Sequence, residues 1–349
     1  MAQPDQHHSD RPLRVGVVGT RTVCQGIGAY VARGFARAGC EVVALVGTRP
    51  ETVEQARAEL SRRFGLECRG YLDVESLLAG QPLDAIAICS PPAAHRAALA
   101  AALEAGVHVL CEKPLWWEAG SARRPDLKAQ VEALARGFLE RGRLLALNAQ
   151  WPATLPAYRR LHPRAEEGGL RRFAMRLSPR GETPGRGDAD ARQRRERLVV
   201  DAAPHAISLL QALAGHGSVE DAAASEPTAH GERAALDALD LRFTWATSAG
   251  RTQVELELRQ CPEQPRPAGY AINDHWADRE VELPGYAMSL VSRERPARHV
   301  PLDDPLDLHV ADFVAGIAAG RLTDVEALVE SLGALRDLVG VAAGPEEAA

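Results

Sequence analysis

Short apolar runs alternate with helical stretches through the first third of the chain. Four apolar runs of strand length cover residues 13–18, 41–46, 83–89 and 107–111. Three stretches with helical spacing or composition fill 28–38, 50–64 and 95–105. Continuous apolar strands that alternate with helices are typical of a parallel sheet covered on both faces. Because crossovers between parallel strands are right-handed, the pattern predicts a doubly wound α/β domain.

The pattern becomes alternating after a helix at 123–141 and a strand at 144–147. Apolar and polar residues alternate at 173–177, 239–245, 252–259, 279–283 and 287–292. This alternation predicts strands with one solvated face, with a hairpin turn at 248–250. The Gly-, Pro-, Asp- and Arg-rich stretch 176–197 predicts a long loop. Closing helices are expected at 307–319 and 325–339.

These patterns divide the chain into three parts. We expect a disordered tail at 1–12, the doubly wound domain at 13–146, and an α+β domain at 147–345 with a mostly antiparallel open sheet. The open sheet has a face to cover, which favours a homo-oligomer.

Composition narrows the partners and the location. The 349 residues carry a net charge of −6 and are 46% hydrophobic, which predicts no nucleic-acid or membrane partner. The polar N-terminus lacks a signal-peptide pattern, so we expect a cytoplasmic protein. Six cysteines without a Cys-x-x-Cys pair, and histidines without metal-ligand spacing, predict neither a disulfide framework nor a metal site.

The first strand ends at Gly19, where a dinucleotide-binding fold needs a glycine-rich turn. Read without gaps, the sequence does not fit Gly-x-Gly-x-x-Gly. If 21–25 is an insertion, Gly19-Thr20 joins Gly26-Ile27-Gly28-Ala29 to give the accepted variant Gly-x-Gly-x-x-Ala. The strand–turn–helix context favours a Rossmann domain with a bound dinucleotide over a glycine turn without a ligand.

The second strand ends in Val46-Gly47-Thr48-Arg49, without the carboxylate that usually holds the ribose of NAD. Thr48 and Arg49 would instead hydrogen-bond and pair with a 2′-phosphate. The alternative for Arg49 is a solvated loop residue before a helix. The sequence therefore favours NADP(H), with NAD(H) as the alternative cofactor.

Three further motifs identify a family. Residues 84–95 read DAIAICSPPAAH, residues 106–115 read GVHVLCEKPL, and an Asp and a His stand four apart at Asp201 and His205. In this order the chain resembles the Gfo/Idh/MocA oxidoreductase family, well over 13–118 and again over 198–215. In relatives the Asp–His pair opens a helix of the second domain, whereas Asp201 taken alone is typical of a helix N-cap.

The resemblance implies a role for each matching residue. Lys113 would lie near the nicotinamide and contact the reacting oxygen, with Lys113–Pro114 a candidate cis bond. His205 would be the general acid–base, and Asp201 would orient that site. The resemblance thus implies hydride transfer.

The remaining candidates line the cofactor and the substrate. The cofactor-binding set is Gly19, Thr20, Gly26, Ile27, Gly28, Thr48, Arg49, Ser90, Pro91, Pro92, His95, Glu112 and Lys113. The substrate-binding set is Lys113, Trp116, Asn148, Trp151, Asp201 and His205. For His95, as for His162, a structural role is the favoured interpretation, and packing between domains is the alternative for Trp116 and Trp117.

Two features depart from the family pattern or leave alternatives open. Ser208 stands where many relatives carry a second Asp, which weakens the case for a polyol held by a carboxylate. The arginines at 192–197 would clamp an anionic substrate or, as we favour, belong to a solvated mobile loop.

The leading hypothesis is an NAD(P)-dependent oxidoreductase, favoured in the reductive direction. Its substrate would be a carbonyl, hydroxyl or imine carbon of a small sugar-derived or secondary metabolite. The alternatives are a non-redox lyase or epimerase with a tightly bound dinucleotide, and a non-catalytic cofactor-binding protein.

Overall fold

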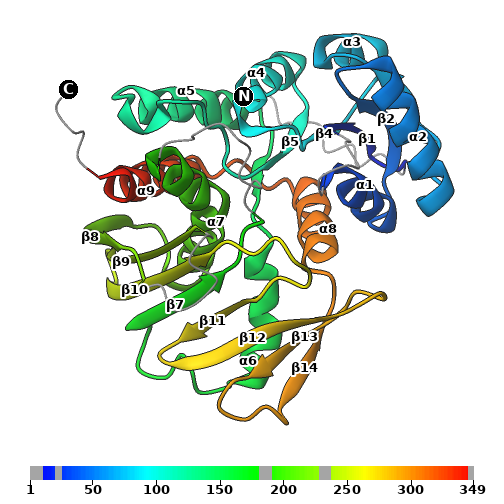
Figure 1. Ribbon diagram of the computed structural model, residues 1–349. Helices are drawn as coiled ribbons and strands as arrows, with labels where there is room; N and C mark the ends of the chain where they lie inside the picture. The colour runs from blue at the N-terminus through cyan, green and yellow to red at the C-terminus, as the bar shows by residue number, and fades with distance from the viewer. Residues whose placement is uncertain (1–10, 20–25, 181–190, 228–236, 345–349) are drawn as a thin grey trace. The chain divides into compact units, whose positions relative to one another are not determined.

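The computed structural model describes residues 11–19, 26–180, 191–227 and 237–344 (Figure 1). These residues form two compact units. The first takes its described residues from Met1–Trp116, Ala133–Asn148 and Leu306–Val325. The second takes its described residues from Trp117–Glu132, Ala149–Pro305 and Glu326–Ala349.

The first unit contains a six-stranded parallel sheet, as the apolar runs predict. Its strands are β1 (Arg14–Val18), β2 (Glu41–Val46), β3 (Arg69–Tyr71), β4 (Ala85–Ile88), β5 (His108–Glu112) and β6 (Leu145–Asn148). The order β3-β2-β1-β4-β5-β6 is that of a doubly wound nucleotide-binding fold. Strand order reverses between β1 and β4, and ligands of such sheets bind outside the carboxyl ends of the strands at this point.

Helices cover both faces of this sheet (Figure 1). The helices are α1 (Gly28–Arg37), α2 (Pro50–Phe64), α3 (Val74–Gly80), α4 (His95–Ala105), α8 (Pro305–Ala318) and, across both units, α5 (Leu127–Glu140). Apolar residues of α1, α2 and α8 share one buried cluster with β1, in which Phe35 and Phe313 meet edge to face at 6.0 Å. Gly16 of β1 faces Leu77 of α3 instead. Helix α8, expected with the second domain, therefore packs in the first unit.

The second unit contains an eight-stranded, mostly antiparallel sheet; among its described strands, only β7 and β10 pair in parallel. Its strands are β7 (Arg172–Leu177), β8 (Ser218–Ser225), β9 (Ala238–Thr247), β10 (Gly250–Arg259), β11 (Ala268–Ile272), β12 (His275–Glu282), β13 (Ala287–Ser292) and β14 (His299–Leu302). The predicted hairpin turn joins β9 to β10, because Thr247 pairs with Gly250. The mixed α/β fold class predicted from the pattern is confirmed.

One face of this second sheet is apolar, as the alternation requires. Phe173, Phe243, Leu256 and Tyr270 are buried on it. Helices α6 (Leu155–Leu161) and α7 (Ala191–Ala214) contact the sheet, and α9 (Val325–Ala343) completes the unit. No described helix is long and apolar enough to cross a lipid bilayer.

The structure corrects the predicted loop at 176–197. Arg176 belongs to β7, and α7 begins at Ala191, with 181–190 outside the described residues. Asp201 consequently lies in the interior of α7, so it neither opens the helix nor caps it. Alanine, arginine and glutamine favour helix, and their propensity outweighs the charge density that suggested a loop.

Of the tail predicted to be disordered, the structure describes Arg11 and Pro12. Arg11 donates two hydrogen bonds to the Asp84 carboxylate, at 2.7 and 2.8 Å.

Candidate active site

Gly19 ends β1 at the strand-order reversal in a backbone conformation that favours glycine. Its φ is +89°, and its N–H donates to the Val46 carbonyl at 3.0 Å. A Cβ here would lie 2.5 Å from the Ser90 nitrogen and 2.6 Å from the Cys89 carbonyl carbon. The turn therefore passes the loop after β4 only because position 19 has no side chain. Thr20 and the inferred insertion at 21–25 lie outside the described residues, whereas Gly26 and Ile27 lead directly into α1 at Gly28.

Thr48 and Arg49 follow β2, and both are exposed. Arg49 is extended, with φ −141° and ψ 138°, because the following Pro50 disfavours a helical conformation before it. Arg49 thus follows the carboxyl end of β2, where the second strand of a Rossmann fold meets the ribose.

His95 is completely buried and ties together the loops that follow β4 and β5. Its Nε2 lies 2.6 Å from the Ser90 carbonyl oxygen, and its Nδ1 lies 3.1 Å from that of Pro114 and 3.2 Å from that of Leu115. Burial lowers the pKa of this imidazole, while the carbonyl contacts oppose the shift. Its described contacts make His95 a positioning residue for the loops that hold Ser90-Pro91-Pro92 and Lys113; the Lys113–Pro114 bond is cis.

Three buried polar atoms without a hydrogen-bond partner among the described residues lie beyond the ends of adjacent strands. They are Ser90 Oγ after β4, Trp116 Nε1 after β5 and Asn148 Oδ1 at the end of β6. The Asn148 side-chain amide meanwhile donates to the Glu112 carboxylate. Burying such groups unpaired costs about 1–3 kcal/mol each. Polar groups of a bound molecule would satisfy them, so this edge of the sheet fits a dinucleotide with a carboxamide-bearing ring.

The candidate catalytic residues come from both units. Lys113 directly follows β5 and is half-buried in the first unit. Asp201 and His205 lie one turn apart on α7 in the second unit, with Asp201 exposed and His205 half-buried. The Ser208 hydroxyl donates to the His205 carbonyl oxygen at 2.8 Å, a local helix contact. The structure thus brings Asp201 and His205 onto one helical face.

Trp151, a predicted substrate residue, is buried near two arginines that the sequence patterns missed. Its ring meets Tyr270 edge to face at 6.0 Å, and the Arg279 guanidinium carbon lies 5.5 Å from its centre. Arg279 donates to the Arg266 carbonyl oxygen at 3.3 Å. Strand alternation could have indicated Arg279, because residues two apart share a face and Val281 lies on the face predicted to be apolar.

The arginines of 192–197 lie on the first turns of α7 rather than in a loop. Arg194 pairs with Asp237 at 3.0 Å, and Arg195 pairs with Glu226. Trp117 is buried and donates its indole N–H to Glu196 of the same turns at 2.9 Å. These contacts anchor the start of α7.

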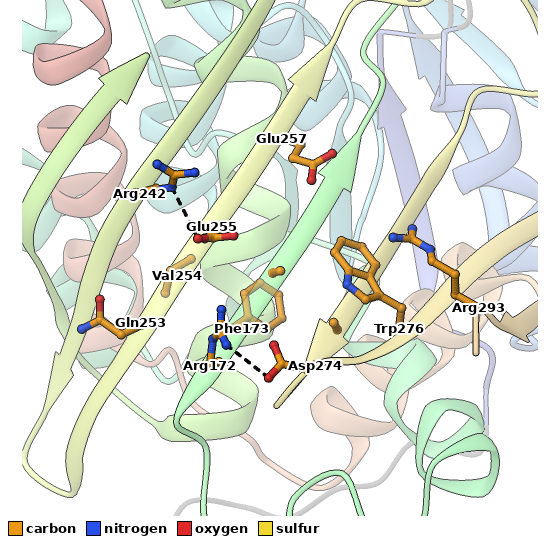
Figure 2. Close-up of a pocket in the computed structure, with 12 residues that line it drawn as sticks. Arg172, Phe173, Arg242, Gln253, Val254, Glu255, Glu257, Asp274, Trp276 and Arg293 are labelled. Atoms are coloured by element: carbon orange, nitrogen blue, oxygen red, sulfur yellow. Dashed lines mark hydrogen bonds and ion pairs between the residues drawn. The ribbon is translucent and has the colours of Figure 1, made fainter. Parts of the chain in front are cut away.

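The polar face of the second sheet contains a hollow of about 570 Å³ (Figure 2). Its floor is formed by neighbouring strands, from which charged side chains project in pairs, among them Arg242 with Glu255 and Arg172 with Asp274. None of the predicted site residues that the structure describes lines this hollow.

The chain is similar to proteins of known activity. Residues 13–131 match the model of an oxidoreductase family with an NAD-binding Rossmann fold. Over 329 residues the chain is 27% identical to UDP-N-acetylglucosamine 3-dehydrogenase of Acidithiobacillus ferrooxidans, covering 88% of this chain and 90% of that protein. Over 138 residues it is 33% identical to inositol 2-dehydrogenase 4 of Saccharopolyspora erythraea, covering 38% of each.

Solved structures share the fold across the chain. A structure of the A. ferrooxidans enzyme covers 94% of this chain and 99% of its own, with a TM-score of 0.63 and 25% identity. An inositol dehydrogenase homologue of Azotobacter vinelandii, complexed with NADH and myo-inositol, covers 95% of this chain and 96% of its own. Its TM-score is 0.64 at 19% identity, which supports the fold alone. The motifs, the strand order and these matches agree: over residues 13–131 the chain matches the Gfo/Idh/MocA family of oxidoreductases, and a relative at 27% identity extends the similarity over most of the chain.

Proposed function

We propose that this protein transfers hydride between a nicotinamide cofactor and a carbonyl or hydroxyl carbon of a small sugar-derived metabolite. The observation that carries the proposal is the set of three buried polar atoms without a partner among the described residues, Ser90 Oγ, Trp116 Nε1 and Asn148 Oδ1, which follow or end the adjacent strands β4, β5 and β6. Sugar derivatives are favoured because the names of relatives include a UDP-N-acetylglucosamine dehydrogenase and inositol dehydrogenases. The match with the first relative spans most of both chains.

Each candidate residue has a chemical task in this proposal. A bound nicotinamide supplies or accepts the hydride. Lys113 donates a hydrogen bond to the reacting oxygen and stabilises its alkoxide form. His205 gives a proton to that oxygen in reduction and removes it in oxidation, and Asp201 orients the imidazole.

Composition supports a specific need for lysine at 113. The chain contains two lysines, Lys113 and Lys128, against 39 arginines. Lysine can approach an oxygen as a compact ammonium group and lose its proton, whereas arginine stays charged and planar. Arginine would bring the charge on a larger, planar group and could not reproduce the contact of a compact ammonium group with the reacting oxygen.

Lys113 can therefore be tested with a conservative change. We expect Lys113→Arg to lower kcat at least about 100-fold with nucleotide affinity within about 2-fold of the parent. Lys128→Arg is the matched control and should leave both unchanged. Full activity in Lys113→Arg would refute the proposed role, and loss of nucleotide binding would assign Lys113 to cofactor binding instead.

We also propose a preference for NADP(H) and for reduction, supported by Arg49 and the lack of a carboxylate after β2. The test is a fluorescence titration with NADPH and NADH. We expect tighter NADPH binding, and Arg49→Ala should weaken NADPH about 10-fold while leaving NADH unchanged. Arg62→Ala is the control, because it removes an exposed arginine from the last turn of α2, the helix that Arg49 precedes. Tighter NADH binding would remove the NADP assignment, and binding of neither nucleotide would refute hydride transfer.

Finally, we propose that the polar face of the second sheet joins two copies of the chain. Its paired charges can exchange partners with an identical surface. Light scattering at low and high salt tests this: a dimer that dissociates with salt is expected, and a monomer under both conditions contradicts it.

A further inference from the structure

Arg279 is a charged residue on the apolar face of the second sheet. In the β-ladder it lies between Ala268 of β11 and Leu290 of β13, and both of these are buried. Its strand neighbours Asp278 and Glu280 belong to the opposite, polar face. A guanidinium on the apolar side needs a compensating partner, because burying a charge is costly.

Within the described residues, that partner is not a carboxylate. Arg279 donates to the Arg266 carbonyl oxygen and lies over Trp151, and its Nε is buried without an acceptor. Burial lowers the pKa of the Arg279 guanidinium, and the charge of Arg266 lowers it further. Burial likewise lowers the pKa of Arg266, partly opposed by the charge of Asp201.

The same sheet shows what a fully compensated arginine looks like. Arg293, on the polar face, lies 3.9 Å from the centre of the Trp276 ring and donates two hydrogen bonds to Asp278, at 2.9 and 2.5 Å. Arg279 has the tryptophan, but no carboxylate of the described residues pairs with it. Relative to Arg293, Arg279 therefore lacks an anionic partner within the described part of the chain.

The two arginines lie near Asp201, one of the proposed active-site residues. Arg266 precedes β11 and is close enough to Asp201 of α7 for their charges to interact. Trp151 was itself predicted to contact substrate. The two arginines therefore lie in the part of the second unit that carries Asp201.

We propose that Arg279, whose guanidinium lies over the Trp151 ring, and Arg266 together bind an anionic group of the substrate, a carboxylate or a phosphate. The substrate is then a charged sugar derivative rather than a neutral polyol. The identification of the bound molecule as the substrate rests on the proposed function. The existence of an anion site at Arg279 and Arg266 does not depend on it.

The first test measures binding by calorimetry with sodium phosphate, D-glucose 6-phosphate, D-glucuronate and neutral D-glucose. We expect at least one anion to bind more tightly than glucose, and Arg279→Met to weaken it at least about 10-fold. Arg293→Met is the matched control, an arginine stacked on a tryptophan on the other face, and should change affinity less than 2-fold. Binding of phosphates alone or of glucuronate alone supports the site and identifies its chemistry. If no anion binds more tightly than glucose, or if Arg279→Met binds as the parent does, the proposal is wrong.

The second test uses thermal stability without added anions, in a buffer of uncharged components. If Arg279 awaits an anion, Arg279→Met removes an uncompensated charge and should raise Tm. If Arg279 is only structural, Tm should fall, and that result would overturn the inference. Nucleotide titrations of the same variants separate the two proposals, because loss of anion binding with intact nucleotide binding refutes this site but leaves hydride transfer standing.

Discussion

The contact between Gly19 and the loop after β4 makes a quantitative prediction for Gly19→Ala. Left-handed backbone costs an alanine about 1–2 kcal/mol. The added methyl group would also lie 2.5 Å from the Ser90 nitrogen, against backbone that cannot turn away. Forcing an extra carbon into packed structure typically costs a further 1–3 kcal/mol. We therefore expect Gly19→Ala to lower the free energy of unfolding by about 2–5 kcal/mol.

Gly39→Ala provides the matched control. Gly39 has a similar φ of +82°, but a Cβ there would meet no atom within 4 Å. It should show the backbone cost alone, about 1–2 kcal/mol. Urea denaturation of both variants and the parent gives the comparison, and NADPH titration should show weaker binding for Gly19→Ala only. Equal destabilisation by the two substitutions would refute the close approach of the β1 turn to the loop after β4.

Two further predictions concern stability. Burial lowers the pKa of His108 to about 4, while its Nδ1 accepts the Leu144 N–H at 2.9 Å. Since an unfolded histidine titrates near pH 6.5, neutral His108 stabilises the fold above that pH, and about 1–3 kcal/mol should be lost between pH 6.5 and 4. His108→Gln should flatten that part of the denaturation profile, and an unchanged profile would count against it. Separately, Trp117→Phe should cost about 1–3 kcal/mol in urea denaturation because it leaves the Glu196 carboxylate without its indole donor, and a neutral effect would contradict this.

The first sheet was predictable because its strands are buried on both faces. Three predicted elements, Glu41–Val46, Pro50–Phe64 and His95–Ala105, match the bounds of β2, α2 and α4. A continuous apolar run is recognised as a strand without deciding which of its residues face the core. The helices between these strands have clear start and stop residues. Pro50 begins α2, and Gly65 ends it at φ +67°.

The second sheet was harder, because short strands contain few diagnostic residues. Strand β8 contains the bulge at which Asp221 takes a φ of +52°, so its alternation is interrupted. Strand β11 reads Ala-Gly-Tyr-Ala-Ile and is buried throughout. Neither strand shows the period of two from which its neighbours were predicted.

Some candidate site residues could be predicted from local sequence, whereas others depend on contacts between distant segments of the chain. Lys113, Asp201 and His205 came from motifs, each of which is a short contiguous sequence. The three unpartnered polar atoms could not be predicted, since each depends on how chain ends from three different strands are buried.

Arg279 and Arg293 show that strand alternation can indicate a candidate site residue where no sequence motif does. Arg279 lies in β12 and Arg293 directly follows β13, and both stack on a tryptophan. Strand alternation puts Arg279 with Ala277 and Val281 on the apolar side, where a protein selected for stability alone would place another apolar residue. Arg279 is a charged residue at a position where the alternation that predicted its strand calls for an apolar one. Its buried charge therefore needs a compensating group from another part of the chain or from a ligand. When the described chain supplies no carboxylate for that compensation, a ligand becomes the physically consistent source, and position in the alternation becomes evidence about function.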